Sequence, residues 1–226
     1  MKKIIIYALL FLGTTINAFA QKDVQAAAIL NQVSKKYRAY DIVKSEFVFT
    51  IEDQQNHEQQ SQDGTLIVQS KTNKYKMSLY GTTATAAPQA ETEIISDGKS
   101  QWTYTKKDKE VQLNNVDKSD EGFNPAQLFT IYEKGYKYIY TGTGTIKGRM
   151  YQFIDLTPED PNKSFFKIRL TIDKEKKQIY NALIFSNDGN KYNYTLKTFT
   201  PNVKAPVSTF TYDKNAHPGV ELVDLR

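Results

Sequence analysis

The chain contains no cysteine, only two histidines and a single tryptophan among its 226 residues. Without thiols it can form neither a disulfide bond nor a cysteine nucleophile. His57 and His217 are the only imidazole bases, and the pair His57-Glu58 lacks the second histidine of a zinc-protease motif. The sequence also lacks a G-x-S-x-G elbow, a P-loop and a G-x-G-x-x-G loop. We therefore predict a binding protein rather than an enzyme, without a metal site or a cofactor.

Long hydrophobic runs are also missing. The apolar run Ile4–Leu12 spans nine residues, whereas a membrane-spanning helix needs about 20. Lys2 and Lys3 precede this run and Ala18-Phe19-Ala20 follows it, which is the pattern of a cleaved signal peptide. We predict cleavage after residue 20, export to the periplasm, and a single domain over residues 21–226. No cysteine follows the cut, so we expect no lipid anchor.

Charge of one sign is not dominant. The chain has 30 basic and 25 acidic residues and a formal net charge of +5. Loss of Lys2 and Lys3 with the signal peptide would lower this charge further. No basic stripe follows a predicted face, so the composition argues against a nucleic-acid partner.

Aromatic residues are abundant, with 15 tyrosines and 12 phenylalanines, and many of them alternate with polar residues. Phe47, Phe49 and Ile51 share one face of a predicted strand. The run Phe166–Ile172 alternates in the same way, with Phe166, Ile168 and Leu170 predicted to face inward. About eleven such strands indicate a mainly antiparallel β-sheet.

Two segments have helical patterns. Apolar residues recur at three- and four-residue steps between Asp23 and Tyr40. In the second segment, Asn124 is a suitable N-cap, Pro125 fits the first turn and Gly135 ends the pattern. We therefore expect helices over residues 23–40 and 124–134.

Turns are predicted from local chemistry. Asp63-Gly64, Asp97-Gly98 and Asp188-Gly189 favour tight turns because these residue types tolerate positive φ. The residues around His217 also form a turn pattern, so we expect a solvated histidine there. Phe210–Tyr212 is predicted to be a strand.

A strand pattern with hydrophobic residues on one face describes a large curved sheet whose concave face needs a cover. The two predicted helices are the candidates for that cover. Such an arrangement encloses either a packed core or a lined cavity, and the residue pattern alone is compatible with both.

Several segments, in this order along the chain, resemble the LolA family of periplasmic outer-membrane lipoprotein carriers. They are the signal peptide with the first helix, ISDGKSQWTYTKKDKEVQLNNVD (residues 95–117), NPAQLF (Asn124–Phe129), FFKIRLTID (Phe165–Asp173) and FTYDKNAHPGVELVDLR (Phe210–Arg226). The resemblance implies an incomplete, strongly curved antiparallel β-barrel with helices as a lid over a hydrophobic cavity.

The resemblance also implies where acyl chains bind. The expected cavity residues are Phe47, Phe49, Leu66, Met77, Leu79, Trp102, Tyr104, Ile168 and Leu170 on the sheet, and Leu128, Phe129 and Ile131 on the lid. For each of them, ordinary core packing is the alternative. Family members often carry a basic residue followed by proline that latches the lid, whereas this chain has Ser70 and Lys71 near that position.

The resemblance implies a carrier that accepts its cargo at one membrane and delivers it to another. An inner-membrane ATP-driven releasing complex supplies acylated lipoproteins, and the outer membrane, with an acceptor if one is present, receives them. We expect a monomeric carrier that is not embedded in the membrane. The alternative is a lipid- or lipoprotein-sensing interaction domain on the same half-barrel.

Overall fold

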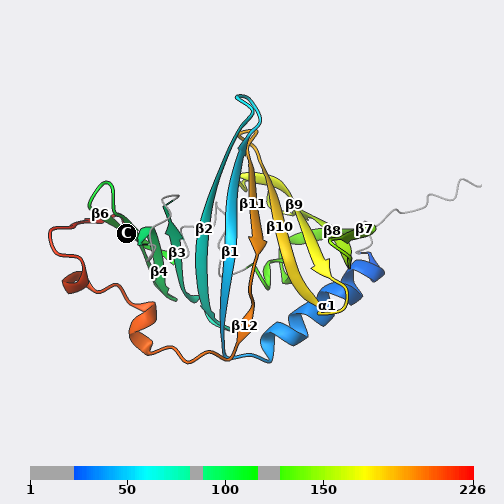
Figure 1. Cartoon of the computed structure of the whole chain (residues 1–226), viewed down its shortest axis with the longest axis horizontal. Helices are drawn as coiled ribbons and strands as arrows, with labels where there is room; N and C mark the ends of the chain where they lie inside the picture. Colours follow the sequence, from blue (N-terminus) through cyan, green and yellow to red (C-terminus); the bar gives the residue numbers. More distant parts are fainter. Residues whose placement is uncertain (1–22, 82–88, 117–127) are drawn as a thin grey trace, which may run out of the picture.

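The computed structural model of the chain describes residues 23–81, 89–116 and 128–226. Within these ranges the chain forms one α-helix, α1 (Val24–Arg38), and one large sheet (Figure 1). The side chain of Asp23 caps α1 by accepting hydrogen bonds from the backbone N–H groups of Gln25 and Ala26. The other carboxylate oxygen of Asp23 accepts the N–H of Tyr140 at 2.9 Å. One side chain therefore both starts the helix and ties it to the sheet.

The sheet has 13 strands, two more than the pattern predicts. They are β1 (Ile42–Asp53), β2 (Glu58–Gln69), β3 (Lys74–Tyr80), β4 (Ala90–Asp97), β5 (Ser100–Thr105), β6 (Glu110–Asn115), β7 (Tyr136–Ile146), β8 (Arg149–Pro158), β9 (Phe165–Asp173), β10 (Gln178–Ser186), β11 (Lys191–Leu196), β12 (Thr200–Pro201) and β13 (Glu221–Asp224).

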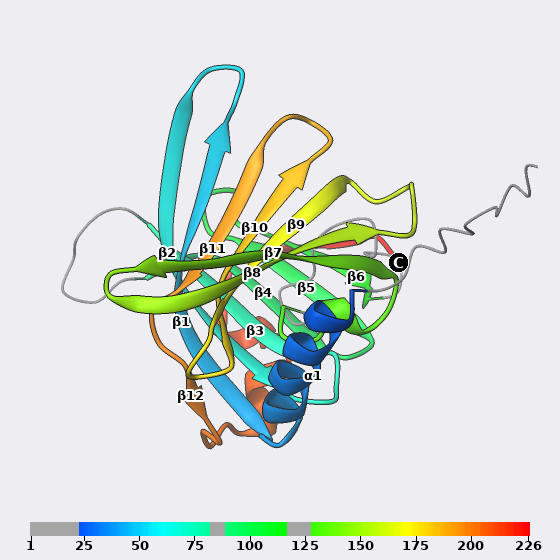
Figure 2. The same cartoon turned by 90° about the vertical axis from the view of Figure 1, so that its right-hand side faces the viewer.

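The strands are ordered β13-β6-β5-β4-β3-β2-β1-β11-β10-β9-β8-β7, and β12 pairs with β1. All pairs are antiparallel except β13 with β6. Figure 2 shows the sheet curled into an open half-barrel with α1 inside the curve. The predicted fold class, an incomplete and strongly curved barrel, is confirmed.

The strand register assigns side chains to the two faces of β1 to β5. Met77 pairs with Leu66 on one side and with Ile94 on the other, and all three belong to or pack against the core that includes α1. We call the face that these residues share the concave face. Ile95 is the neighbour of Ile94 and pairs with Trp102, so both point to the opposite, convex face.

The C-terminal segment covers part of the convex face. After β12 the chain forms a short 3-10 helix, η4 (Val207–Phe210), which contacts β3 and β4. Phe210 is buried, although it is outside the concave core, as are Ile95, Val111 and Leu113 on the neighbouring strands. The segment then ends in β13 at the sheet edge. The strand predicted over Phe210–Tyr212 is therefore wrong, because Phe210 ends a 3-10 helix that packs on the sheet.

The predicted turn at Asp63-Gly64 is also wrong, since both residues lie inside β2. Gly64 is opposite Phe47 in the register, and a Cβ atom on Gly64 would lie 2.4 Å from the Cζ atom of Phe47. The glycine therefore provides space for an aromatic ring rather than a reversal of the chain. The predicted turns at Asp97-Gly98 and Asp188-Gly189 are confirmed, between β4 and β5 and between β10 and β11.

One inward-facing residue is predicted incorrectly in β9. The register shifts between the Phe185 and Ser186 pairs, so that Phe165 is buried and Phe166 is 54% exposed. Ile168 and Leu170 face the core as predicted. The irregularity therefore reverses the alternation only at the beginning of the strand.

Candidate functional site: the concave face and its cover

The second predicted helix, over residues 124–134, is only partly described. Residues 124–127 lie outside the described ranges, as does the predicted signal peptide. Residues 128–130 form a turn that leads into a 3-10 helix, η3 (Ile131–Glu133). This part of the expected α-helix is therefore wrong, and we call residues 128–134 the lid segment.

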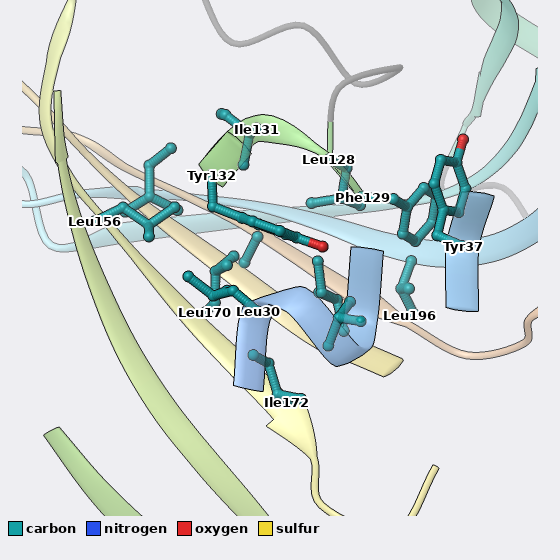
Figure 3. Close-up of a cluster of buried hydrophobic side chains, with 14 of the residues drawn as sticks. Leu30, Tyr37, Leu128, Phe129, Ile131, Tyr132, Leu156, Leu170, Ile172 and Leu196 are labelled. Carbon is teal, nitrogen blue, oxygen red and sulfur yellow. The ribbon is translucent and has the colours of Figure 1, made fainter. Parts of the chain in front are cut away.

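The lid segment and α1 cover the concave face with apolar side chains. Leu128, Phe129 and Ile131 are each at most 6% exposed. In Figure 3, Tyr132 lies between the lid segment and the side chains of Leu30 on α1 and Leu170 on β9. The concave core is therefore formed by side chains from three parts of the fold: the lid segment, α1 and the sheet.

An aromatic contact fixes the lid segment to α1. The rings of Tyr37 and Phe129 stack with centroids 4.7 Å apart, and Phe199 meets Phe129 edge-on at 5.6 Å. Such pairs add about 0.5–1.5 kcal/mol beyond the burial of their area. The lid segment is thus attached by its apolar side chains.

An ion pair attaches the other end of the lid segment. Arg38, the last residue of α1, donates from Nε to Oε1 of Glu133 at 2.9 Å, and its Nη2 atom also contacts Oε2. Ser34 donates a hydrogen bond to the same carboxylate. The hydrogen bond from Arg38, together with the nearby charges, holds the pKa of Glu133 below its usual range.

The residues expected to latch the lid are placed differently. Ser70 is buried, and its hydroxyl lies beside that of Tyr37, whereas Lys71 is exposed in the turn between β2 and β3. Burial raises the pKa of Tyr37 to about 12, and the Ser70 hydroxyl opposes this rise. Within the described residues, neither Ser70 nor Lys71 makes a side-chain hydrogen bond to the lid segment. The pair Arg38–Glu133 instead connects the lid segment to α1. The sequence does not reveal this pair, because the two residues are 95 positions apart.

Most of the expected cavity residues come together on the concave face. Phe47, Leu66, Met77, Ile168 and Leu170 are buried in the concave core, and Phe49 and Leu79 pack against it while staying partly exposed. Whether any of them contacts lipid stays a prediction.

Two expected cavity residues are placed elsewhere. Trp102 and Tyr104 lie on the convex face, because Trp102 pairs with Ile95 and Tyr104 pairs with Glu93. Tyr104 contacts His217 of the C-terminal segment with ring centroids 4.5 Å apart. The alternating pattern places these two residues on the same face of the strand, but it does not indicate whether that face is concave or convex.

His217 is not the solvated residue that we expected. Its ring lies between those of Tyr104 and Tyr212, and its Nε2 atom is 3.7 Å from Oε2 of Glu93. The imidazole therefore helps to hold the C-terminal segment on the convex face.

The concave face is not evenly covered. Among the partly exposed side chains that pack against the core, five lie on β1, β3, β4 and β11, and we call them the half-buried cluster. They are Phe49, Leu79, Ile94, Tyr192 and Tyr194.

Within the half-buried cluster, the ring centroid of Phe49 is 4.7 Å from that of Tyr194 and 6.3 Å from that of Tyr192, with the latter pair almost parallel. Burial raises the pKa of Tyr194. A partly uncovered group of apolar and aromatic side chains, continuous with a core, can bind apolar ligands.

The described residues offer little for other chemistry. They contain no group of three or more histidine and acidic side chains placed to hold a metal ion. Among the same residues, none of the helices has the length and apolar character needed to cross a bilayer.

The sequence matches one family, described as outer membrane lipoprotein carrier protein LolA, over residues 38–213. No curated protein matches the chain. An uncharacterized conserved protein from Thermus thermophilus has a similar structure, with a TM-score of 0.57 and 9% sequence identity, and the match covers 88% of this chain and 99% of that one.

Two weaker structural matches have TM-scores below 0.5. A LolA superfamily protein from Nitrosomonas europaea has a TM-score of 0.45 and 13% identity, with 84% of this chain and 98% of that one covered. LprF from Mycobacterium bovis has a TM-score of 0.46 and 15% identity, with 80% and 96% covered.

Proposed function

We propose, from the premise that this chain belongs to the LolA family, that it binds the acyl chains of lipoproteins in the periplasm and carries them to the outer membrane. The cargo would come from an ATP-driven releasing complex in the inner membrane. Binding and transfer, rather than catalysis, are the proposed activity.

The observation that carries this proposal is the uneven cover of the concave face. The sheet presents many apolar side chains on its concave face, where α1 and the lid segment cover the core among the described residues, and the half-buried cluster remains partly exposed. A carrier needs an apolar surface that water reaches only in part, since its ligand must enter and leave.

The energy of transfer explains why a carrier is needed. Each methylene that leaves water contributes about 0.8 kcal/mol, so an acyl chain of roughly sixteen carbons gains on the order of 12 kcal/mol. Without a carrier, moving the acyl chain of a lipoprotein from the membrane into water would cost this free energy. A carrier supplies a replacement surface, and the aromatic rings of the half-buried cluster offer large contact areas.

Release requires that the cover can open. The lid segment is attached to α1 by apolar packing that includes the Tyr37–Phe129 stack, and by the Glu133 carboxylate, which pairs with Arg38, accepts a hydrogen bond from Ser34 and is 22% accessible. These contacts are made by a short segment and do not include the backbone hydrogen bonds of the sheet. Opening can therefore expose the core without breaking strand pairs.

The test is a two-step transfer assay with a triacylated peptide. Donor vesicles hold the peptide together with the ATP-driven releasing complex, the protein accepts the released peptide, and acceptor vesicles receive it. We expect the wild-type protein to complete both steps and Leu128→Glu to fail at the first, because a charge would be buried against the core. Val207→Glu, at a position 78% exposed on η4, is the matched control and should behave as wild type.

A different result would change the proposal. If the protein removes the peptide but never releases it to acceptor vesicles, a lipoprotein-sensing domain describes it better than a carrier. If Leu128→Glu folds and still removes the peptide at the wild-type rate, the concave face is not the binding surface.

A further inference from the structure

A polar cleft opens beside the lid segment. It has a volume of about 790 Å³, within the range of small-molecule sites. Its walls are the last turn of α1, the turn between β2 and β3, the lid segment with the beginning of β7, and the loop between β8 and β9.

The cleft adjoins the concave core. Tyr37, Ile131 and Tyr136 line it and are also members of that core. A molecule with its apolar part under the lid segment would therefore have its polar part in the cleft. The hydroxyl of Tyr37 lies at this boundary, near the buried hydroxyl of Ser70, and neither hydroxyl has a hydrogen-bond partner within the described residues.

The charge of the cleft is unbalanced. Its lining includes four cationic side chains but only two carboxylates. Glu133 is already engaged by Arg38. The other charged lining residues are Asp160 and three lysines, Lys71, Lys134 and Lys163. Their sum is positive, so a monoanionic or dianionic ligand would be attracted.

We propose that this cleft binds the phosphate of an anionic acyl lipid whose tails enter the concave core. In a glycerophospholipid the phosphate is only a few atoms from the ester-linked tails, which fits a cationic cleft that directly adjoins an apolar core. Lysine side chains bind phosphate as point charges through charge-assisted hydrogen bonds. This inference rests on the proposed function, since it places acyl chains on the same concave face.

The test compares two lipids with identical acyl chains, phosphatidylglycerol and diacylglycerol, which differ in the phosphate-bearing head group. Uptake by the purified protein is measured by native mass spectrometry with both lipids in competition. We expect the wild-type protein to prefer phosphatidylglycerol by about tenfold, the effect of a small number of charge-assisted contacts. The preference should fall as salt is added.

Two double variants make the test specific. Lys71→Gln with Lys134→Gln should abolish the preference while leaving the uptake of diacylglycerol unchanged. Lys106→Gln with Lys107→Gln removes two exposed hairpin lysines that do not line the cleft, and it should retain the preference.

The failures of the two proposals are distinguishable. Equal uptake of both lipids by the wild-type protein would overturn the cleft inference and leave the carrier proposal standing. Failure to take up either lipid or a triacylated peptide would overturn both. Glycerol 3-phosphate, which has no acyl chain, is the last arm. If it binds as tightly as phosphatidylglycerol, the cleft holds free phosphate esters and the inference about an acyl lipid is wrong.

Discussion

The two faces of the sheet bury similar kinds of residue but are covered in different ways. The concave face lies under α1 and the lid segment, and the half-buried cluster on it remains partly exposed. On the convex face, the chain's own C-terminal segment packs Phe210 onto β3 and β4 and holds Tyr104 against His217. The half-buried cluster on the concave face is thus partly exposed, whereas Tyr104 on the convex face is packed against the chain's own C-terminal segment.

This difference shows that an aromatic residue on a sheet is informative about binding only once its face is known. Phe49 and Trp102 follow the same alternating pattern and are both partly exposed. The cover over each face, and not the strand that carries the residue, distinguishes them.

Charged substitutions on the two faces should have opposite outcomes for ligand uptake. Phe49→Glu places a carboxylate in the half-buried cluster and should abolish the uptake of a triacylated peptide. Trp102→Glu makes the same change on the convex face and should leave uptake close to wild type. Uptake is measured by co-elution of labelled peptide with the protein. Equal loss in both variants would show that the faces are not functionally distinct.

Truncation of a buried leucine should cost more on the concave face. Leu170 is fully buried there, and Leu170→Ala should lower the unfolding free energy of the protein by about 2–5 kcal/mol. Leu113→Ala on the convex face should cost less, because Leu113 is 5% exposed and the C-terminal segment at this edge of the sheet can move toward the space that the side chain leaves. Urea unfolding of both variants checks this order, and a larger loss for Leu113→Ala would contradict it.

The sequence predicted much of this fold, because alternation and tight-turn chemistry are local signals. Strand β3 and the turn at Asp97-Gly98, for example, follow from neighbouring residues alone. What it could not predict depends on distant partners. Gly64 is explained by Phe47 on the next strand, and the face of Trp102 depends on a register with Ile95 that no short motif encodes.

The candidate site was predicted in part for the same reason. Residues on β1, β2 and β9 come together as expected because a single sheet places alternate residues on one face. Ser70 and Lys71 were expected to latch the lid only by position. The observed contact is between Arg38 and Glu133, and it becomes visible only when the lid segment is placed against the end of α1.

The close approach of Gly64 and Phe47 can be tested on its own. Gly64→Ala should cost about 1–3 kcal/mol, because the new methyl group would overlap the Phe47 ring. In a Phe47→Leu background the same change should cost less, which a double-mutant cycle measures. Additive effects of the two changes would show that the ring does not occupy the space above the glycine.

The ion pair on the lid segment should have the smallest effect on stability and a defined pH dependence. Glu133→Gln should cost about 0.2–1 kcal/mol near neutral pH, since the pair is partly exposed. The pKa of Glu133 is lowered in the folded protein, so its contribution is present above the unfolded pKa of about 4.3 and is lost as the pH falls through the folded value.

Unfolding free energies of wild type and Glu133→Gln, measured between neutral and strongly acidic pH, should therefore converge below about pH 4. Glu175→Gln, at an exposed hairpin carboxylate, is the control and should show no such convergence. A constant difference between wild type and Glu133→Gln at every pH would mean that the ion pair does not attach the lid segment.

If the concave face holds acyl chains, native mass spectrometry of the protein purified from its own cells should detect them. We expect an added mass that organic extraction identifies as an acylated molecule, and the loss of that mass in Leu128→Glu. A wild-type protein that carries no added mass, and that takes up no triacylated peptide when it is offered, would mean that the concave face is a packed core and not a binding site.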